Sequence, residues 1–353
     1  MKETRLLFVG FGTVGQGCAK HLVSTKEYLK MKYGFKFRVV GIVDTVKGSI
    51  LNDNGVDLSR ALSVVGKGKK LEGSEFRGKK GLPPIDAIKT SDADTLIEAT
   101  WTNLKDAEPG TSHIIAALKS RIDVATSNKG PLALNFTKLT RLAKSKKRHL
   151  KYESTVMSGT PIFNLKDHCL RGARINKIRG ILNGTTNFIL TEMVNGKDYH
   201  SVLKDAQARG YAEVDPTGDV EARDPAAKIT ILSNAMLNAD ISYDEVQKEG
   251  ITKITLNDIQ QAVCESKRIK LLAEAYRNQD GKYSVSVKPT LLPENDLLAH
   301  VDGVMNAVQF SMNVQPDVTI VGPGAGGDSA GFGLLSDVLS IHEANRLEKV
   351  KSA

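Results

Sequence analysis

The sequence predicts an α/β protein with a doubly wound parallel sheet and a second, α+β part with a mixed sheet. In the first 150 residues, short apolar runs alternate with helical stretches, the order that gives parallel strands joined by helices. A glycine-rich turn at residues 10–15 follows the first run. Beyond residue 150 the pattern changes, because residues 284–289 and 304–310 alternate like strands of a mixed or antiparallel sheet.

The first half contains the elements of the parallel sheet in a regular order. Residues 4–10 contain a short apolar run that ends at a glycine, which is typical of a buried strand. A helix over residues 13–33, with Gly34 near its end, and a strand over 37–43 complete a βαβ unit. Strands are also expected at 95–99, 123–126 and 150–153, helices at 113–119 and around 139–143, and an exposed loop rich in Gly, Lys and Ser at 66–84.

The second half is less regular. A helix over residues 199–209 is expected to end at Gly210. Asp224 followed by Pro225 predicts a helix start, with the Asp as N-cap and the Pro at the first helical position. The remaining expected elements are a strand near 178–182, a helix over 187–194 and a final helix over 334–349 after the glycine-rich residues 322–333.

Composition and charge restrict the class of protein. With 353 residues, 41% of them hydrophobic and 25% charged, the chain is long enough for two globular domains. No run approaches the ~20 apolar residues of a membrane span. The absence of a signal-like N-terminus and three scattered cysteines favour the reducing cytoplasm. The net charge of +9 admits nucleic-acid binding, but the basic clusters lack interleaved aromatics, so we expect a solvated basic face and no nucleic-acid partner.

The glycine-rich turn has the spacing of a dinucleotide-binding loop. It reads Gly10-Phe11-Gly12-Thr13-Val14-Gly15 and lies between a predicted strand and a predicted helix. Gly10 permits the tight turn, Gly12 lets the backbone approach a pyrophosphate, and Gly15 lets helix and strand pack closely. The helix N-terminus offers free N–H groups to the phosphates. This context predicts a Rossmann-type cofactor domain, the alternative being a purely structural glycine turn.

Asp44 stands at the end of the second predicted strand, 29 residues after Gly15. An acidic side chain at this point accepts hydrogen bonds from the adenosine ribose and favours NAD. Lys47 follows three residues later and is placed to face a 2′-phosphate, so NADP stays open. The alternative for Asp44 is a local turn at the end of the strand.

A cluster of five acids and one lysine falls between residues 213 and 228. Asp224 and Lys228 are four residues apart and share one helix face, while a turn at residues 215–218 is expected to bring Glu213 and Asp219 toward the same place. Carboxylates suit a substrate amine, and Lys228 suits proton exchange with an alcohol or carbonyl oxygen. The alternative is a surface helix with an exposed ion pair.

Two further motifs follow predicted strands. Residues 126–131 place Lys129 at the carboxyl end of a strand, where ligands bind in doubly wound folds. Residues 183–187 read Asn-Gly-Thr-Thr-Asn and open a helix whose free N–H groups suit a carboxylate or the nicotinamide. The alternatives are a solvent-exposed lysine in a turn and a simple helix cap.

These motifs, in this order, resemble homoserine dehydrogenases. The similarity runs from GFGTVG at residue 10 to GPGAGGDSAGFGLLSD at residue 322 and is most specific in NGTTNFIL and GYAEVDPTGDVEARDPAAK. It implies NAD(P)-dependent interconversion of L-homoserine and L-aspartate 4-semialdehyde, in threonine, methionine and isoleucine biosynthesis, by a homodimer. It also implies a dinucleotide-binding domain over 1–150, completed by 312–353, and a catalytic and dimerisation domain over 151–311.

The resemblance also implies a set of site residues. It assigns catalysis to Lys129 and Lys228 with Asp224. It places homoserine contacts on Gly184, Thr185, Tyr211, Glu213 and Asp219, with Asp224 again among them, and further cofactor contacts on Thr100, Lys129 and Gly324. A structural monovalent cation, such as Na⁺, is expected at Glu153 and the carbonyls of Val156, Ser158 and Thr160.

Two departures and two alternatives qualify the resemblance. The chain ends at Ala353, after the last predicted helix, so a C-terminal regulatory domain and threonine feedback through it are not expected. Residues 66–84 match no family signature and receive no role. The alternatives are another two-domain NAD(P)-dependent dehydrogenase of amino-acid metabolism, such as one with an essential thiol, and a non-catalytic NAD-binding regulator.

Overall fold

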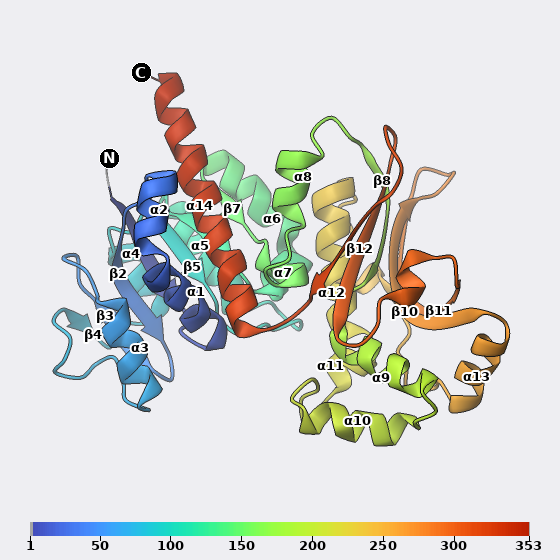
Figure 1. Cartoon of the computed structure of the whole chain (residues 1–353). Helices are drawn as coiled ribbons and strands as arrows, with labels where there is room; N and C mark the ends of the chain where they lie inside the picture. The colour runs from blue at the N-terminus through green and yellow to red at the C-terminus, as the bar shows by residue number, and fades with distance from the viewer. Residues whose placement is uncertain (1–2, 353) are drawn as a thin grey trace. The chain divides into compact units, whose positions relative to one another are not determined.

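The computed structural model describes residues 3–352, with side chains to residue 348, and the chain forms two compact units (Figure 1). Unit 1 comprises Met1–Gly159 and Gly326–Ala353, and unit 2 comprises Thr160–Ala325. The boundaries differ from those expected at residues 150 and 311. Residues 312–325 belong to unit 2 because β13 (Val318–Pro323) pairs with β12 (Met305–Met312) of that unit's sheet.

Unit 1 is built on a sheet that has seven strands among the described residues, in the order β4-β3-β2-β1-β5-β6-β7. Strands β2, β1, β5, β6 and β7 pair in parallel, which confirms the predicted parallel sheet, and β3 and β4 add an antiparallel edge. The edge strand β4 lies within residues 66–84, where only a loop was expected. The bounds are β1 Thr4–Val9, β2 Phe37–Asp44, β3 Gly48–Leu51, β4 Lys79–Lys80, β5 Thr95–Glu98, β6 Asp123–Thr126 and β7 Leu150–Lys151.

The helix expected over residues 13–33 is two helices. Helix α1 (Thr13–Ser24) and helix α2 (Lys26–Tyr33) meet at Thr25, whose φ of −107° and ψ of 7° interrupt the helical backbone. Gly34 ends α2 in the left-handed conformation, as the sequence predicted. The other helices of the unit are α3 Leu58–Gly66, α4 Pro84–Thr90, α5 Gly110–Lys119, α6 Lys129–Lys146, α7 Ser154–Met157 and α14 Gly327–Ser352.

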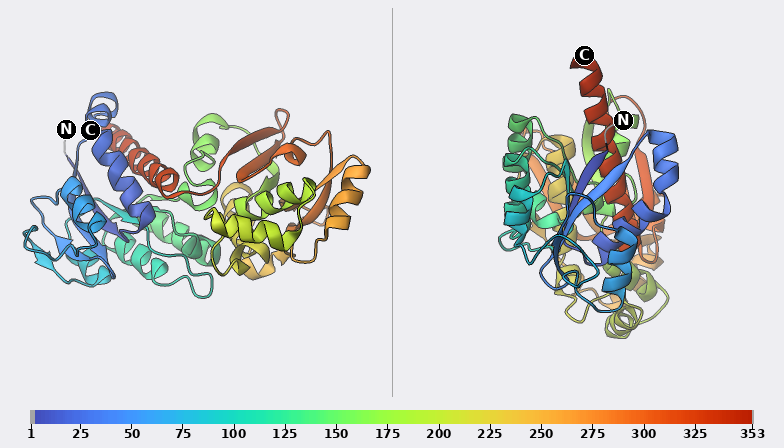
Figure 2. Two further views of the ribbon diagram at one scale, coloured as in Figure 1. Left: turned by 60° about the horizontal axis from the view of Figure 1, so that its bottom comes forward. Right: turned by 90° about the vertical axis from the view of Figure 1, so that its left-hand side faces the viewer.

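The last helix begins seven residues earlier than expected, inside the glycine-rich segment. Helix α14 packs along α1 (Figure 2), and their backbones approach closely at Gly17 and Gly331. A Cβ on Gly17 would lie 2.4 Å from the Gly327 carbonyl oxygen, and one on Gly331 would lie 2.3 Å from the Cys18 nitrogen. Glycines that weaken an isolated helix are therefore required for this contact.

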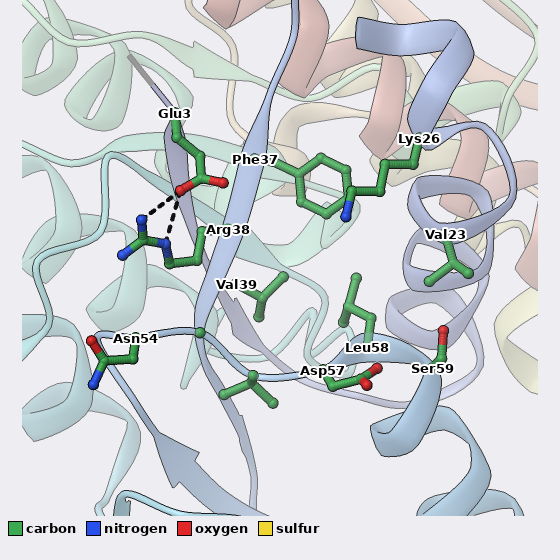
Figure 3. A pocket seen from close by; sticks show the side chains of 12 residues that line it. Glu3, Val23, Lys26, Phe37, Arg38, Val39, Asn54, Asp57, Leu58 and Ser59 are labelled. Atoms are coloured by element: carbon green, nitrogen blue, oxygen red, sulfur yellow. Dashed lines mark hydrogen bonds and ion pairs between the residues drawn. The ribbon is translucent and has the colours of Figure 1, made fainter.

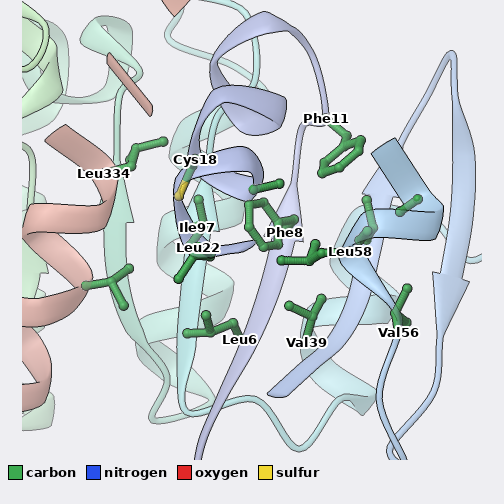
Figure 4. Close-up of a cluster of buried hydrophobic side chains, with 14 of the residues drawn as sticks. Leu6, Phe8, Phe11, Cys18, Leu22, Val39, Val56, Leu58, Ile97 and Leu334 are labelled. Atoms are coloured by element: carbon green, nitrogen blue, oxygen red, sulfur yellow. The ribbon is translucent and has the colours of Figure 1, made fainter. Parts of the chain in front are cut away.

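One apolar core joins α1, α3 and α14 to a face of the sheet (Figure 4). Alternate residues of β1, Leu6 and Phe8, point into it, as the two-residue period of a strand requires. Cys18 and Leu334 contribute from α1 and α14. This packing holds the glycine-rich turn between β1 and α1 on a rigid base.

Unit 2 is built on a mixed sheet with six strands among the described residues, in the order β13-β12-β8-β10-β11-β9. Only β9 pairs in parallel, with β11. Strand β10 had no clear sequence signal because its central residues, 269–273, are all buried and do not alternate between apolar and polar. The remaining bounds are β8 Ile175–Ile181, β9 Gln247–Lys248, β10 Lys267–Arg277 and β11 Tyr283–Pro293.

Helices α9 and α12 pack against the strands of this sheet, α9 on β10 and β12 and α12 on β10 and β11. The helical elements of the unit are α8 Phe163–Cys169, α9 Gly184–Val194, α10 Tyr199–Ala208, α11 Thr217–Val220, α12 Arg223–Leu232 and α13 Leu256–Cys264, with short turns at Ser233–Leu237, Tyr243–Glu245 and Leu297–His300. In the part of the chain described, no helix combines the length and apolar character needed to cross a membrane.

Candidate functional site

The glycine-rich turn has the geometry that its spacing predicted. Gly10 has a φ of +89°, and a Cβ there would lie 2.4 Å from the Ala99 carbonyl oxygen. A Cβ on Gly15 would lie 2.4 Å from the Gly10 carbonyl oxygen. Gly12, by contrast, faces open space, with no heavy atom within 4 Å of a Cβ position. The turn therefore leaves its backbone accessible beside the N-terminus of α1, a fit for a pyrophosphate.

Asp44 closes this turn from the end of β2. Its Oδ2 accepts a hydrogen bond from the Phe11 N–H at 2.7 Å, and its Oδ1 accepts from the N–H groups of Val46 and Lys47, each at 2.9 Å. Burial opposes ionisation, but these hydrogen bonds outweigh it and lower the pKa of Asp44. The carboxylate is therefore ionised and held in place. The hydrogen bonds from Val46 and Lys47 form the local turn that the sequence left open as an alternative.

The carboxyl ends of β5 and β6 carry a buried polar network that includes Thr100. Glu98 is fully buried and accepts hydrogen bonds from Thr126 Oγ1 at 2.8 Å and from the Thr100 N–H at 3.2 Å. Asn128 caps α6 and donates to Thr100 Oγ1 at 3.1 Å. Lys129, the first residue of α6, is half-buried. Sequence reasoning missed Glu98, because a single polar residue at a strand end carries no spacing signal, and it named Asn128 only as part of the motif at residues 126–131.

A surface hollow of about 620 Å³ lies at the N-terminal end of β2, the end away from Asp44 (Figure 3). Its walls include Phe37 and Val39 from β2 and Leu58 from α3. Arg38 forms a 2.6 Å ion pair with Glu3 at its rim. The cofactor residues lie at the carboxyl end of β2, so this hollow is separate from the predicted cofactor site.

In unit 2, Lys228 is buried on α12 and held by two acceptors. Its side chain is only 8% exposed, and Nζ lies 2.8 Å from Asp224 Oδ2 and donates to the Leu182 carbonyl oxygen at 2.7 Å. The surface ion pair that the sequence left open as an alternative is therefore wrong for this residue. A buried ammonium held by a carboxylate and a carbonyl has a fixed position from which to exchange a proton.

Asn183 joins two carboxylates beside this lysine. Its Nδ2 donates to Asp219 Oδ1 at 2.6 Å and to Asp224 Oδ2 at 3.1 Å, while its Oδ1 accepts the Thr186 N–H at 2.9 Å and caps α9. Burial, and then repulsion from Asp224, raise the pKa of Asp219, although the hydrogen bond from Asn183 opposes the shift. The sequence identified Asn183 only as part of a helix-opening motif.

Helix α9 begins at Gly184, three residues before its predicted start, so Gly184 and Thr185 form its first turn. Thr185 Oγ1 donates to the Tyr211 carbonyl oxygen at 2.6 Å, which ties this turn to the acidic segment. One turn further along α9, Asn187 Oδ1 accepts a hydrogen bond from the buried Lys270 at 3.2 Å, and Lys270 also donates to the Val301 carbonyl oxygen at 2.6 Å. The start of α9 is therefore anchored from both sides.

Two expectations for the acidic segment are corrected. Helix α12 begins at Arg223 after Ala222, which has a φ of 62°, so Asp224 lies inside the first turn and is not the N-cap. The left-handed residue turns the chain and lets α12 start earlier than the Asp-Pro pair indicates. Glu213 is exposed, and no hydrogen bond or ion pair joins its carboxylate to Asp219 or Lys228 among the described residues. Tyr211 is 42% exposed.

The residues expected at a cation lie on both sides of a unit boundary. Glu153, Val156 and Ser158 are buried in unit 1, and Ser158 has a φ of 56°. Thr160 is the first residue of unit 2.

Gly324, expected to contact the cofactor, is also in unit 2 and packs against Asn306. Within the described residues, His, Cys, Asp and Glu side chains form no cluster of three able to hold a metal ion.

Comparison with known proteins gives consistent similarities. A family model for homoserine dehydrogenase matches residues 161–339. The chain is 40% identical to an NAD(+)-dependent homoserine dehydrogenase of Pseudomonas canavaninivorans, over 98% of this chain and 97% of that protein. It is 38% identical to a homoserine dehydrogenase of Methanocaldococcus jannaschii, over 97% of this chain and 99% of that one.

Solved structures agree with these sequence similarities. A homoserine dehydrogenase from Thiobacillus denitrificans superposes with a TM-score of 0.84 at 31% identity, covering 98% of this chain and 75% of its own. A hyperthermophilic archaeal homoserine dehydrogenase in complex with NADPH gives a TM-score of 0.82 at 27% identity, covering 97% of this chain and 98% of its own.

Proposed function

Because this chain belongs to the homoserine dehydrogenase family, we propose that Lys228 is the proton-transfer group in the interconversion of L-homoserine and L-aspartate 4-semialdehyde. The family resemblance expected from the sequence is confirmed, and with it an NAD(P)-dependent oxidoreductase. The observation that carries the proposal is the burial of Lys228 between Asp224 and the Leu182 carbonyl oxygen.

The proposed proton path runs through the Lys228 Nζ atom. In the oxidation direction, neutral Nζ accepts the proton of the substrate hydroxyl as that carbon becomes an aldehyde. In the reduction direction, the ammonium returns a proton to the aldehyde oxygen as negative charge develops there. Asp224 orients Nζ through their 2.8 Å contact. When bound, the nicotinamide cofactor accepts or supplies the hydride.

The substrate contacts are proposed on the same face of unit 2. Asp219, Gly184, Thr185 and Tyr211 lie within the network that Asn183 and Thr185 connect, which supports their assignment to homoserine. Glu213 is proposed to approach the substrate amine only when substrate is present, because its carboxylate is exposed. Lys129, at the N-terminus of α6, is proposed as the second catalytic lysine.

The cofactor contacts are proposed on the turn from Gly10 to Gly15, on Asp44, Thr100 and Lys129, and on Gly324 of unit 2. The open space at Gly12 supports the placement of the pyrophosphate. The first test is cofactor reduction, followed at the nicotinamide absorbance, with L-homoserine as the only other substrate. Turnover is expected, and no turnover from protein that still binds the cofactor would reject the proposal.

Asp44 predicts a preference for NAD over NADP. A fixed carboxylate accepts hydrogen bonds from ribose hydroxyls and repels a 2′-phosphate. We expect Asp44→Ser to lower the NAD-to-NADP ratio of kcat/KM by about 10-fold or more, because removing a neighbouring like charge is worth about 1.4 kcal/mol or more. Steady-state kinetics with both cofactors measure this ratio. Lys47→Ser is the matched variant. If the NAD-to-NADP ratio of kcat/KM falls in Lys47→Ser and not in Asp44→Ser, the role assigned to Asp44 is wrong.

We also propose a monovalent cation held by Glu153 and the carbonyls of Val156, Ser158 and Thr160. The burial of Glu153 and the left-handed backbone at Ser158 support a loop that turns carbonyl oxygens toward a common point. Sodium or potassium chloride is expected to raise the melting temperature by a few degrees relative to tetramethylammonium chloride at equal ionic strength. Equal melting temperatures in the three salts would contradict a structural cation.

A cytoplasmic homodimer is proposed as the working form. Lys177 and Arg179 lie on β8 and Glu274 lies on the neighbouring strand β10, and Arg179 pairs with Asp296 at 2.5 Å. Lys177 is 39% exposed and Glu274 25% exposed, and we propose that a second copy packs on this charged surface. Sedimentation velocity at micromolar concentration measures the mass, and a species of 38.2 kDa would contradict a dimer.

A further inference from the structure

Asn306 is a buried amide for which the described part of the chain provides no hydrogen-bond partner. It lies on β12 with 0% exposure, and neither Oδ1 nor Nδ2 has a partner among the described residues. Most buried polar atoms in folded proteins are hydrogen-bonded, because an unpaired buried group loses its interactions with water without compensation. A buried asparagine that no protein group satisfies therefore points to a bound molecule.

The surroundings of Asn306 place it beside the start of α9. Its Oδ1 lies 3.6 Å from the position of a Cβ on Gly184, the first residue of α9. A Cβ on Gly324 would lie 2.1 Å from Nδ2 and 2.4 Å from Oδ1, so only glycine fits there. The next residue of β12, Ala307, pairs with Ile181, which precedes the Leu182 carbonyl that holds Lys228.

The helix start and the asparagine have complementary chemistry. The first N–H groups of an α-helix have no partner inside the helix and favour an anion. A carboxamide carries a donor and an acceptor on one carbon. The α-carbon of an amino acid carries an ammonium, which donates, and a carboxylate, which accepts, so a single asparagine side chain can bond to both groups at once.

We propose that Asn306 binds the α-ammonium and α-carboxylate of the amino-acid substrate, with the carboxylate also facing the N-terminus of α9. The inference rests on the proposed function, because that function places homoserine at Gly184 and Thr185. It adds a residue that recognises the unreactive end of the substrate, whereas Lys228 acts at the reacting end. The glycine at position 324 is then required to leave room for the amide.

The test separates binding from folding with Asn306→Leu, which keeps the shape of the side chain and removes both polar atoms. The kcat/KM for L-homoserine is expected to fall about 10- to 100-fold, mainly through KM, since bonds to charged groups are lost. The melting temperature is expected to stay the same or rise, because an unpaired polar group is removed. Asn306→Asp, which replaces the donor with a second acceptor facing the substrate carboxylate, is expected to lose more than the leucine variant.

Asn234→Leu is the matched control. Asn234 is also buried in unit 2, but its amide donates to the Ile241 carbonyl oxygen and accepts from the Ile241 N–H, both at 2.9 Å. Its replacement is expected to lower the melting temperature and to leave the KM for homoserine within about threefold. A fall in melting temperature with unchanged KM in Asn306→Leu would show that Asn306 is structural and overturn the proposal.

Binding of L-2-aminobutyrate, which keeps both α-groups and lacks the hydroxyl, tests the contact without turnover. Calorimetry should show its Kd rising by a similar factor in Asn306→Leu. An unchanged Kd, or a variant that instead weakens NADH and leaves the substrate unaffected, would overturn the inference and assign the amide to the nicotinamide carboxamide. Failure of wild-type protein to oxidise homoserine would reject the proposed function, while this binding measurement would still test Asn306.

Discussion

Lys228→Ala is expected to lower kcat for homoserine oxidation by about 10²- to 10⁴-fold, the range that a positioned proton-transfer group contributes. The effect is expected in kcat because the proton moves only as the reaction proceeds, so the interaction belongs to the transition state. The change in kcat is measured from the absorbance of the reduced cofactor, in both pre-steady-state and steady-state experiments. Lys228 is buried with Asp224, so the substitution also leaves a carboxylate without its partner, and circular dichroism must show that the variant is folded.

An exposed pair of the same spacing provides the control for this prediction. Asp205 of α10 and Arg209, which caps the end of that helix, form an i,i+4 ion pair at 2.8 Å, with the Arg209 side chain 53% exposed. Arg209→Ala is expected to leave kcat within about twofold, because exposed pairs contribute little. Near wild-type turnover in Lys228→Ala would reject Lys228 as the proton-transfer group and leave Lys129 as the remaining candidate.

Gly12→Val is expected to reduce kcat/KM for the cofactor by about 100-fold or more without unfolding the protein. Gly12 faces open space and has a φ of −72°, which any residue can adopt, so the added side chain meets no protein atom. It would instead occupy the space beside the N-terminus of α1, where the pyrophosphate is proposed to lie. A displacement of about 1 Å at a reacting group is enough for such a loss.

Two other glycines sharpen this prediction. Gly66 also has open space at its Cβ position but lies at the end of α3, so Gly66→Val is expected to leave the cofactor KM unchanged. Gly10→Val should destabilise the fold, since its Cβ would lie 2.4 Å from the Ala99 carbonyl oxygen at a φ of +89°. Trp101, the only tryptophan, follows the proposed cofactor contact Thr100, so NADH is expected to quench its fluorescence. Unchanged quenching by NADH in Gly12→Val would contradict the placement of the pyrophosphate.

The sequence determined the features that depend on neighbours along the chain. The alternation of strands and helices predicted the parallel sheet, because each buried strand needs a continuous apolar run. The positions of Gly10, Gly12 and Gly15 predicted the turn, because a tight turn, a backbone open to a pyrophosphate and close helix–strand packing each need a residue without a side chain. The spacing of Asp224 and Lys228 likewise placed both on one helix face, and their 2.8 Å contact follows from it.

Only the tertiary structure decided the features that depend on contacts between distant segments. It extended α14 into a glycine-rich run, since the packing of Gly17 and Gly331 stabilises what local propensity opposes. It buried Lys228 against the Leu182 carbonyl, 46 residues away, and so excluded the exposed ion pair that the sequence left open beside a catalytic role. It also enclosed Asn306 without a hydrogen-bond partner among the residues that the structure describes, a property that no spacing in the sequence encodes. Burial and hydrogen-bond satisfaction arise from the whole fold, and so local patterns identified the motifs but not their environment.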